Sequence, residues 1–201
     1  MKLYYAAHTC ALAPHIALIE QGLPYELVKV DNKAKKTADG RDYLKINPKG
    51  YVPALELSNG EILTEGPVIS QYLGDLKPET GFVPKNGTLP RVRLQEWLHY
   101  LGTEVHGGFG PLFNPAIPDD VKAASKDKLL KRISFIEPVL EKQEYLLGTS
   151  FTPADAYLFT MMRWLKIFKI DYNQWPGIAK FMERVAARPA VKKAIELEEG
   201  N

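Results

Sequence analysis

The pattern of apolar residues changes character near residue 80, and this change limits the folds that the chain can adopt. Before that point, strand-like and helix-like segments alternate. Residues 2–6 (KLYYA) and 25–30 (YELVKV) have the composition of short strands, and between them lies a helical pattern that Gly22 is placed to end. From Leu89 onward we find only helical periodicity. The sequence therefore predicts an α/β domain followed by an all-α domain.

The first domain is predicted to include a hairpin. The pair Asn59-Gly60 is a hairpin signal between two short strands at residues 54–57 and 61–63. The polar residues 35–40 are expected to form loop with a short helix. The run TEGPVISQYLGDL then begins a helix, with Glu65 expected in its first turn. We place this domain at residues 1–80, a linker at 81–88 and the helical domain at 89–201.

The helical part carries its own start and stop signals. Pro138 is expected to bend a long helix. Thr152, followed by Pro153 and by Asp155 three positions after the threonine, predicts a capping box with Asp in place of Glu. This motif is expected to serve folding, and removal of Thr152 or Asp155 should cost about 1 kcal/mol. Two shorter helices, about 176–187 and 189–198, are predicted at the end.

Composition excludes some functions. The 26 basic and 24 acidic residues leave a net charge of +2, which does not favour a nucleic-acid surface. No apolar run approaches the roughly 20 residues that span a bilayer, and the N-terminal residues do not resemble a secretion signal. The chain has one cysteine. We therefore expect a cytoplasmic protein without nucleic-acid or membrane partners.

The single cysteine, Cys10, has two possible roles: a residue of the hydrophobic core or a reactive thiol. A free cysteine is usually a small buried hydrophobic residue. Cys10, however, follows a predicted strand and immediately precedes a predicted helix, whose N–H groups and dipole favour an anion. Such positions lower a cysteine pKa from about 8.5 to roughly 3.5–7.5. We therefore expect a thiolate, and because no second cysteine exists, any disulfide would join Cys10 to another molecule.

Four motifs in order give the chain a family resemblance: NPKGYVPAL, TEGPVISQYL, TEVHGGF and FTPADAYLFTMMRW. Together with the cysteine turn, they make the chain resemble a glutathione transferase over essentially its whole length, and more narrowly the bacterial beta class. The resemblance implies a thioredoxin-like N-terminal domain, an all-helical C-terminal domain and a homodimer. It also implies a cis bond between Val52 and Pro53.

The resemblance assigns a glutathione site to the first domain. The backbone of Val52, before Pro53, would pair with the peptide ligand as an added strand does. Glu65 would accept the ligand ammonium, and the N–H of Gly66 would hold the adjoining carboxylate. Lys35 matches a residue that meets the glycine carboxylate. Without the resemblance, Glu65 is a charge stabilising its own helix and Lys35 a solvated loop lysine.

Further site residues are implied in the helical domain. His106 matches a histidine near the cysteine sulfur, where it would hold a thiolate or shuttle a proton; otherwise it would satisfy carbonyls at a helix end. Thr103 and Glu104 match residues that reach glutathione from the partner subunit. His99 stands where the class commonly has asparagine. Tyr5 lies near the sulfur in the family, and strand core is an equal reading.

The expected function is conjugation of the glutathione thiol to small hydrophobic electrophiles, as in detoxification, with glutathione as co-substrate and no metal. One alternative is a glutathione-dependent thiol-disulfide oxidoreductase working through a Cys10 mixed disulfide, and disulfide reductase or peroxidase side activity is compatible with the first reading. A second alternative is a non-catalytic protein that binds hydrophobic ligands. Residues that would line a hydrophobic site, or equally form ordinary core, are Phe109, Phe113, Met162 and Trp164.

Overall fold

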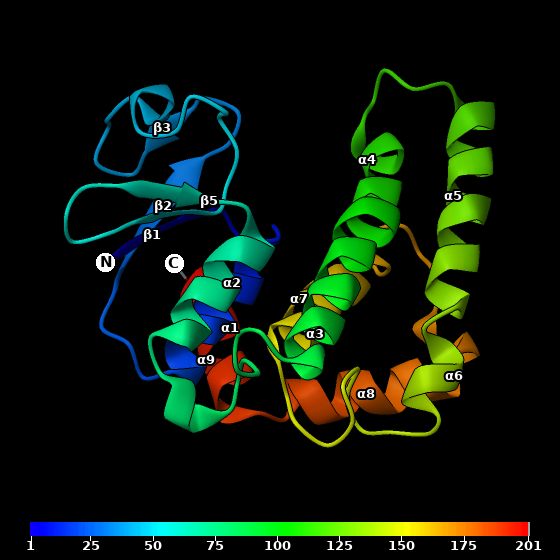
Figure 1. The fold of residues 1–201 in the computed structure, drawn as a ribbon. Helices are drawn as coiled ribbons and strands as arrows, with labels where there is room; N and C mark the ends of the chain where they lie inside the picture. Colours follow the sequence, from blue (N-terminus) through cyan, green and yellow to red (C-terminus); the bar gives the residue numbers. More distant parts are fainter. Residues whose placement is uncertain (201) are drawn as a thin grey trace. The chain divides into compact units, whose positions relative to one another are not determined.

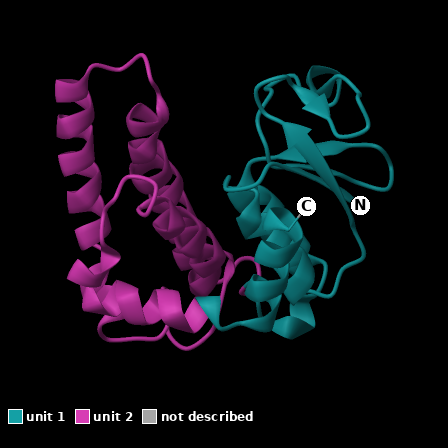
Figure 2. Ribbon diagram, turned by 180° about the vertical axis from the view of Figure 1, so that it is seen from behind, with its two compact units in different colours: residues 1–83, 186–201 teal, residues 84–185 magenta. Residues whose placement is uncertain are grey.

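The structure, a computed structural model, describes residues 1–200 and divides into two compact units. The first runs from Met1 to Val83 and also contains the C-terminal segment that begins at Ala186; the second is Pro84–Val185 (Figure 2). The division after Val83 falls inside the predicted linker. The predicted helical domain included the last helix, whereas the compact units group that helix with the first unit.

Unit 1 is built on a five-stranded sheet (Figure 1). Its strand order is β3-β2-β1-β4-β5, in which β1 and β2 are parallel and the other neighbours antiparallel. The helix α1 packs against both α2 and α9. The elements are β1 (Lys2–Tyr5), α1 (Leu12–Glu20), β2 (Glu26–Asp31), β3 (Lys36–Thr37), the 3-10 turn η1 (Tyr43–Lys45), β4 (Ala54–Glu56), β5 (Ile62–Thr64), α2 (Gly66–Asp75), the 3-10 turn η2 (Pro78–Thr80) and α9 (Pro189–Glu199).

The predicted strands and hairpin of unit 1 are confirmed. The central strand β1 buries Leu3, Tyr4 and Tyr5 in succession, as expected of a strand covered on both faces. Strands β4 and β5 pair with Ala54 opposite Thr64, and Gly60 in the connecting turn has φ 86°, a conformation that glycine adopts without strain.

Two local predictions in unit 1 need correction. The polar stretch around residues 35–40 contains the short strand β3, which pairs with the edge of β2. Its two residues are too few to show strand periodicity in the sequence. Glu65 lies at the N-cap of α2 instead of in the first turn, and its φ is 68°. Its carboxylate is therefore presented before the helix begins.

Unit 2 is helical, as predicted. Its elements are α3 (Leu89–Tyr100), the π-helix η3 (Leu101–His106), α4 (Gly107–Phe113), α5 (Asp119–Ser134), α6 (Glu137–Leu140), α7 (Pro153–Trp164), the 3-10 turn η4 (Tyr172–Gln174) and α8 (Pro176–Ala186). Pro138 lies in the first turn of α6, so the chain breaks between α5 and α6 instead of bending. The predicted helix end at His106 is not found, because η3 continues directly into α4.

The core of unit 2 is formed around α7. All but one of its residues are buried, which is typical of a helix surrounded by others. Its capping box is confirmed: Thr152 is the N-cap, and the N–H of Thr152 donates to the Asp155 carboxylate at 2.8 Å. Among residues 1–200, no helix is both long enough and apolar enough to cross a bilayer.

Candidate functional site

Cys10 lies in the turn between β1 and α1, next to the segment that contains the cis peptide bond. Its Sγ atom is 3.6 Å from the backbone oxygen of Val52, which accepts a hydrogen bond from the thiol. The bond between Val52 and Pro53 is cis, as the resemblance implied. The turn is held by Thr9, whose hydroxyl donates to the Ala6 oxygen at 2.7 Å and accepts from the N–H of Ala11 at 3.3 Å.

The ionisation of Cys10 differs from the expected thiolate. Burial raises the pKa of Cys10 to about 12, its own backbone N–H lowers it, and the negative charges of Glu65 and Glu198 raise it. The thiol also faces a carbonyl oxygen, which favours the protonated form. The prediction of a thiolate, made from the position of Cys10 before a helix, was therefore wrong. Desolvation and nearby carboxylates, contributed by distant parts of the chain, outweigh the helix N-terminus.

Gly66 brings the start of α2 to the same place. A Cβ atom on Gly66 would lie 3.5 Å from Cγ of Pro53 and 3.9 Å from the Cys10 oxygen. These are ordinary van der Waals distances, and they place the start of α2 beside the cysteine turn. Cys10, Pro53 and Gly66 are thus brought together within unit 1.

Glu65 is exposed at the edge of this group. Its side chain is 64% exposed, and its Oε1 accepts from the Nζ of Lys49 at 2.9 Å. Lys49 also donates to the hydroxyl of Thr64 at 2.9 Å. Sequence reasoning did not single out Lys49, although it stands inside the quoted motif NPKGYVPAL. Its pairing depends on β5 returning beside that loop, which periodicity does not reveal.

Lys35 is directed to the loop that precedes the cis bond. Its Nζ donates to the Gly50 oxygen at 2.7 Å and lies 5.7 Å from the centroid of the Tyr51 ring. The ammonium is therefore held against the loop and is not simply solvated. The loop itself is fixed from inside, because Tyr43 and Asn47 both donate to the Tyr51 oxygen at 2.8 Å.

Tyr5 belongs to the core of unit 1. Its side chain is 2% exposed within the buried run of β1. This favours the reading of Tyr5 as strand core over a direct contact with a ligand.

In unit 2, His106 ends the π-helix η3 and is half-buried. Its Nδ1 lies 2.6 Å from the hydroxyl of Tyr157, a partner that sequence reasoning missed. Three residues implied by the resemblance lie just before it. The hydroxyl of Thr103 donates to the His99 oxygen at 3.0 Å, and Glu104 pairs with Arg132 at 2.6 Å.

The apolar candidates in unit 2 divide between core and surface. Phe109, Met162 and Trp164 are buried, whereas Phe113 is 47% exposed. The Phe113 ring packs edge-on against Trp164 at 5.5 Å and against Phe168 at 4.9 Å. Phe113 is therefore the one of these four that combines aromatic packing with an accessible surface.

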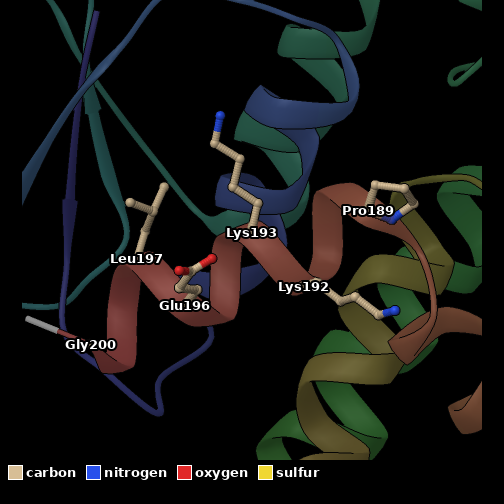
Figure 3. Close-up of a pocket in the computed structure, with 6 residues that line it drawn as sticks. All are labelled: Pro189, Lys192, Lys193, Glu196, Leu197 and Gly200. Atoms are coloured by element: carbon tan, nitrogen blue, oxygen red, sulfur yellow. The ribbon is translucent and has the colours of Figure 1, made fainter.

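A hollow of about 590 Å³ lies elsewhere, along the C-terminal helix α9 (Figure 3). All its lining residues come from that helix or its end: Pro189, Lys192, Lys193, Glu196, Leu197 and Gly200. None of the residues implied by the resemblance lines it. The cysteine turn, and not this hollow, is therefore the candidate site.

Comparison with known proteins identifies the family of the chain. Models of the glutathione S-transferase N-terminal and C-terminal domains match residues 9–76 and 102–189. Glutathione S-transferase GstA of Escherichia coli O157:H7 is 42% identical over 198 residues, covering 98% of each protein. A sphingomonad glutathione S-transferase, solved in complex with glutathione, is 41% identical with a TM-score of 0.96 over 99% of each chain.

The chain belongs to the glutathione S-transferase family. Another solved relative, the bacterial beta class enzyme of Sphingomonas chungbukensis, is 41% identical with a TM-score of 0.95 over 98% of each chain. Within the family, this protein is a glutathione transferase of that bacterial beta class. The family resemblance seen in the sequence is thereby confirmed.

Proposed function

We propose that this transferase binds glutathione in unit 1, at the cysteine turn, and conjugates its thiol to small hydrophobic electrophiles. The observation that carries the proposal is the convergence of Cys10, the cis bond after Val52 and the start of α2 at one place. Glutathione supplies the reacting thiol when it is bound. The residues of the chain bind and orient it.

The charges around the cysteine turn complement a γ-glutamyl tripeptide. The exposed carboxylate of Glu65 accepts the ammonium group, exchanging its contact with Lys49 for the ligand. The N–H of Gly66 at the start of α2 holds the adjoining carboxylate. Lys35, already directed to the loop beside Val52, meets the glycine carboxylate. Val52 pairs with the peptide backbone as a strand edge does.

Cys10 acts in this proposal as a protonated thiol. Because burial raises the pKa of Cys10 to about 12, the thiol stays protonated at pH 7, so Cys10 is a poor nucleophile before the ligand binds. Once the Val52 oxygen pairs with the ligand backbone, the S–H of Cys10 is released to donate a hydrogen bond. A donor aimed at the reacting sulfur stabilises its anionic form.

The same raised pKa counts against thiol-disulfide exchange as the main activity, because exchange requires the thiolate. Disulfide reductase or peroxidase side activity stays a prediction. So does a cytoplasmic location, which rests on the single cysteine.

His106 and the partner subunit complete the proposal. We propose that the imidazole of His106 acts on the reacting sulfur, and that a homodimer brings Thr103 and Glu104 to the ligand of the other subunit. His99 replaces the asparagine common in the class, and an imidazole there can still donate a hydrogen bond. The dimer is tested by sedimentation of the purified protein. A monomer at micromolar concentration would contradict it.

The proposal is tested by two measurements on the full chain. Conjugation of glutathione to a chloronitrobenzene-type acceptor should be catalysed, and calorimetry should show glutathione binding. In the Cys10→Ala variant, conjugation should persist at a reduced rate, because the other site residues remain. Complete loss of conjugation with retained glutathione binding would show that Cys10 is essential to the reaction, against the auxiliary role proposed here. Absence of glutathione binding by the unaltered protein would refute the site.

A further inference from the structure

The ring of His106 is held from one face of α7. Its Nδ1 lies 2.6 Å from the hydroxyl of Tyr157, a side chain that is 3% exposed. The Tyr157 ring meets the imidazole edge-on at 5.8 Å, and the Trp164 ring lies 5.1 Å away. Tyr157 and Trp164 are seven residues apart, two turns of one helix, so both project from the same side. The position of the imidazole is therefore set by α7.

The backbone also distinguishes this histidine. His106 is the last residue of η3, and the next N–H, that of Gly107, bonds to the Gly102 oxygen five residues back. This is the wider π pattern, which is frequent at functional sites. The π-helix thus forms an irregular turn between α3 and α4, and this turn ends at His106, whose ring contacts α7.

The length of the bond indicates which group donates. N–H···O bonds are usually about 2.7–3.2 Å long, whereas O–H···O bonds extend down to about 2.5 Å. At 2.6 Å, the contact favours the Tyr157 O–H donating to Nδ1. A neutral imidazole whose Nδ1 accepts a hydrogen bond carries its proton on Nε2. The opposite tautomer would place an N–H on Nδ1 facing the hydroxyl oxygen at an unusually short distance.

We propose that Tyr157 is a positioning residue that commits His106 to the tautomer with the proton on Nε2, so that His106 serves the transferase as a hydrogen-bond donor and not as a proton acceptor. The inference rests on the proposed function, in which His106 acts on the reacting sulfur. It decides between the two roles that the sequence left open. A donor Nε2–H stabilises a sulfur anion, while a general base needs an unprotonated Nε2.

The test is nitrogen NMR on the full chain labelled at its histidines, with His106 identified by its loss in His106→Gln. The unaltered protein should show the Nε2–H tautomer alone at His106. In Tyr157→Phe the His106 signals should move toward a mixture of tautomers. In the same variant, kcat for conjugation of glutathione to the chloronitrobenzene-type acceptor should fall about tenfold, and KM for glutathione should change little. The fall is smaller than the full contribution of an acid–base group, because His106 itself remains.

Tyr25→Phe is the matched control. Its hydroxyl lies 2.8 Å from Nε2 of His15, so this variant removes a tyrosine–histidine bond elsewhere, in unit 1. It should move the His15 signals and leave both the His106 signals and kcat unchanged. A fall in kcat common to both variants would show a general structural effect and would overturn the proposal.

The outcomes separate this inference from the proposed function. An Nδ1–H tautomer in the unaltered protein, or His106 signals that do not change in Tyr157→Phe, would overturn the inference whatever the activity. A tautomer change with unchanged kcat would overturn it as well. A chain that does not conjugate glutathione would refute the proposed function and with it the catalytic half of the inference, while the NMR still decides the tautomer.

If Tyr157→Phe does not fold, a second experiment replaces the tyrosines by fluorotyrosine, whose hydroxyl is a stronger donor. The Nδ1 signal of His106 should then shift, and no shift would count against the inference.

Discussion

The Sγ atom of Cys10 donates to the backbone oxygen of Val52 across 3.6 Å, joining the single cysteine of the chain to the residue before the cis bond. The contact links a turn after β1 to the loop before β4. It also sets the chemistry of the sulfur, because a thiol can donate to a carbonyl and a thiolate cannot.

The first prediction concerns the titration of Cys10. Burial raises the pKa of Cys10 to about 12, so the native protein should show no thiolate absorbance between about pH 6 and 9. The same chain unfolded in urea should titrate near the ordinary value of about 8.5. Ultraviolet absorbance measures this, with Cys10→Ala subtracting the tyrosine signal. A native transition at neutral pH would contradict the burial argument.

The second prediction concerns Glu65. Glu65→Gln should weaken glutathione binding by about tenfold or more, since a hydrogen bond to a charged group contributes about 1.5–3 kcal/mol. Stability should change little, because the pair with Lys49 is solvent-exposed. Calorimetry measures the binding. Glu61→Gln, an exposed glutamate in the turn before β5, is the control and should bind glutathione normally.

The third prediction concerns the capping box. The fully buried Asp155 carboxylate accepts from the N–H of Leu146, the N–H of Thr152 and the hydroxyl of Thr152. Asp155→Ala should therefore cost about 3 kcal/mol or more, because buried donors lose their acceptor, which exceeds the 1 kcal/mol expected from the motif. Thr152→Ala should cost about 1 kcal/mol. Urea denaturation compares them, and equal losses would contradict the extra role of Asp155.

The fourth prediction is a pH dependence of stability from the same residue. Burial raises the pKa of Asp155 to about 6, and the hydrogen bonds from Leu146 and Thr152 oppose the rise. Because the folded protein holds this proton more tightly than the unfolded chain, Asp155 contributes most below about pH 4. That contribution is lost as the pH rises to about 6.

The contribution of Asp155 is isolated by comparison with Asp155→Asn, which does not titrate. The unfolding free energy of the unaltered protein minus that of Asp155→Asn should fall as the pH rises through this range, by up to about 1.4 kcal/mol per pH unit. A difference that grows with pH would mean that the hydrogen bonds outweigh burial.

The fifth prediction concerns a close contact in unit 2. A Cβ on Gly177 would lie 2.7 Å from the backbone nitrogen of Glu141 and 2.9 Å from the carbonyl carbon of Leu140. The start of α8 is pressed against α6, where Glu137 accepts from the N–H of Gly177 at 2.7 Å. Gly177→Ala should cost about 1–3 kcal/mol of stability by overpacking.

Gly102→Ala is the matched control for Gly177→Ala, because a Cβ at this position in η3 meets nothing within 4 Å and no proline follows it. It should stabilise the chain by about 0.5–1 kcal/mol through helix propensity. Urea denaturation measures both variants. Similar effects of the two substitutions would contradict the packing argument.

The sequence by itself determined the local structure. The hairpin at Asn59-Gly60, the capping box at Thr152 and the change from mixed to helical periodicity all appear in the fold, because each depends on residues a few positions apart. The four motifs in their order were sufficient to identify the family, since their combination is specific.

Only the tertiary structure decided the state of the site residues. The pairing of Lys49 with Glu65, the bond from Tyr157 to His106 and the grouping of α9 with unit 1 join residues that are far apart in the chain. The protonated state of Cys10 likewise depends on residues that are far apart in the chain. A helix N-terminus is visible in sequence, but the desolvation that outweighs it is imposed by side chains that only folding brings near.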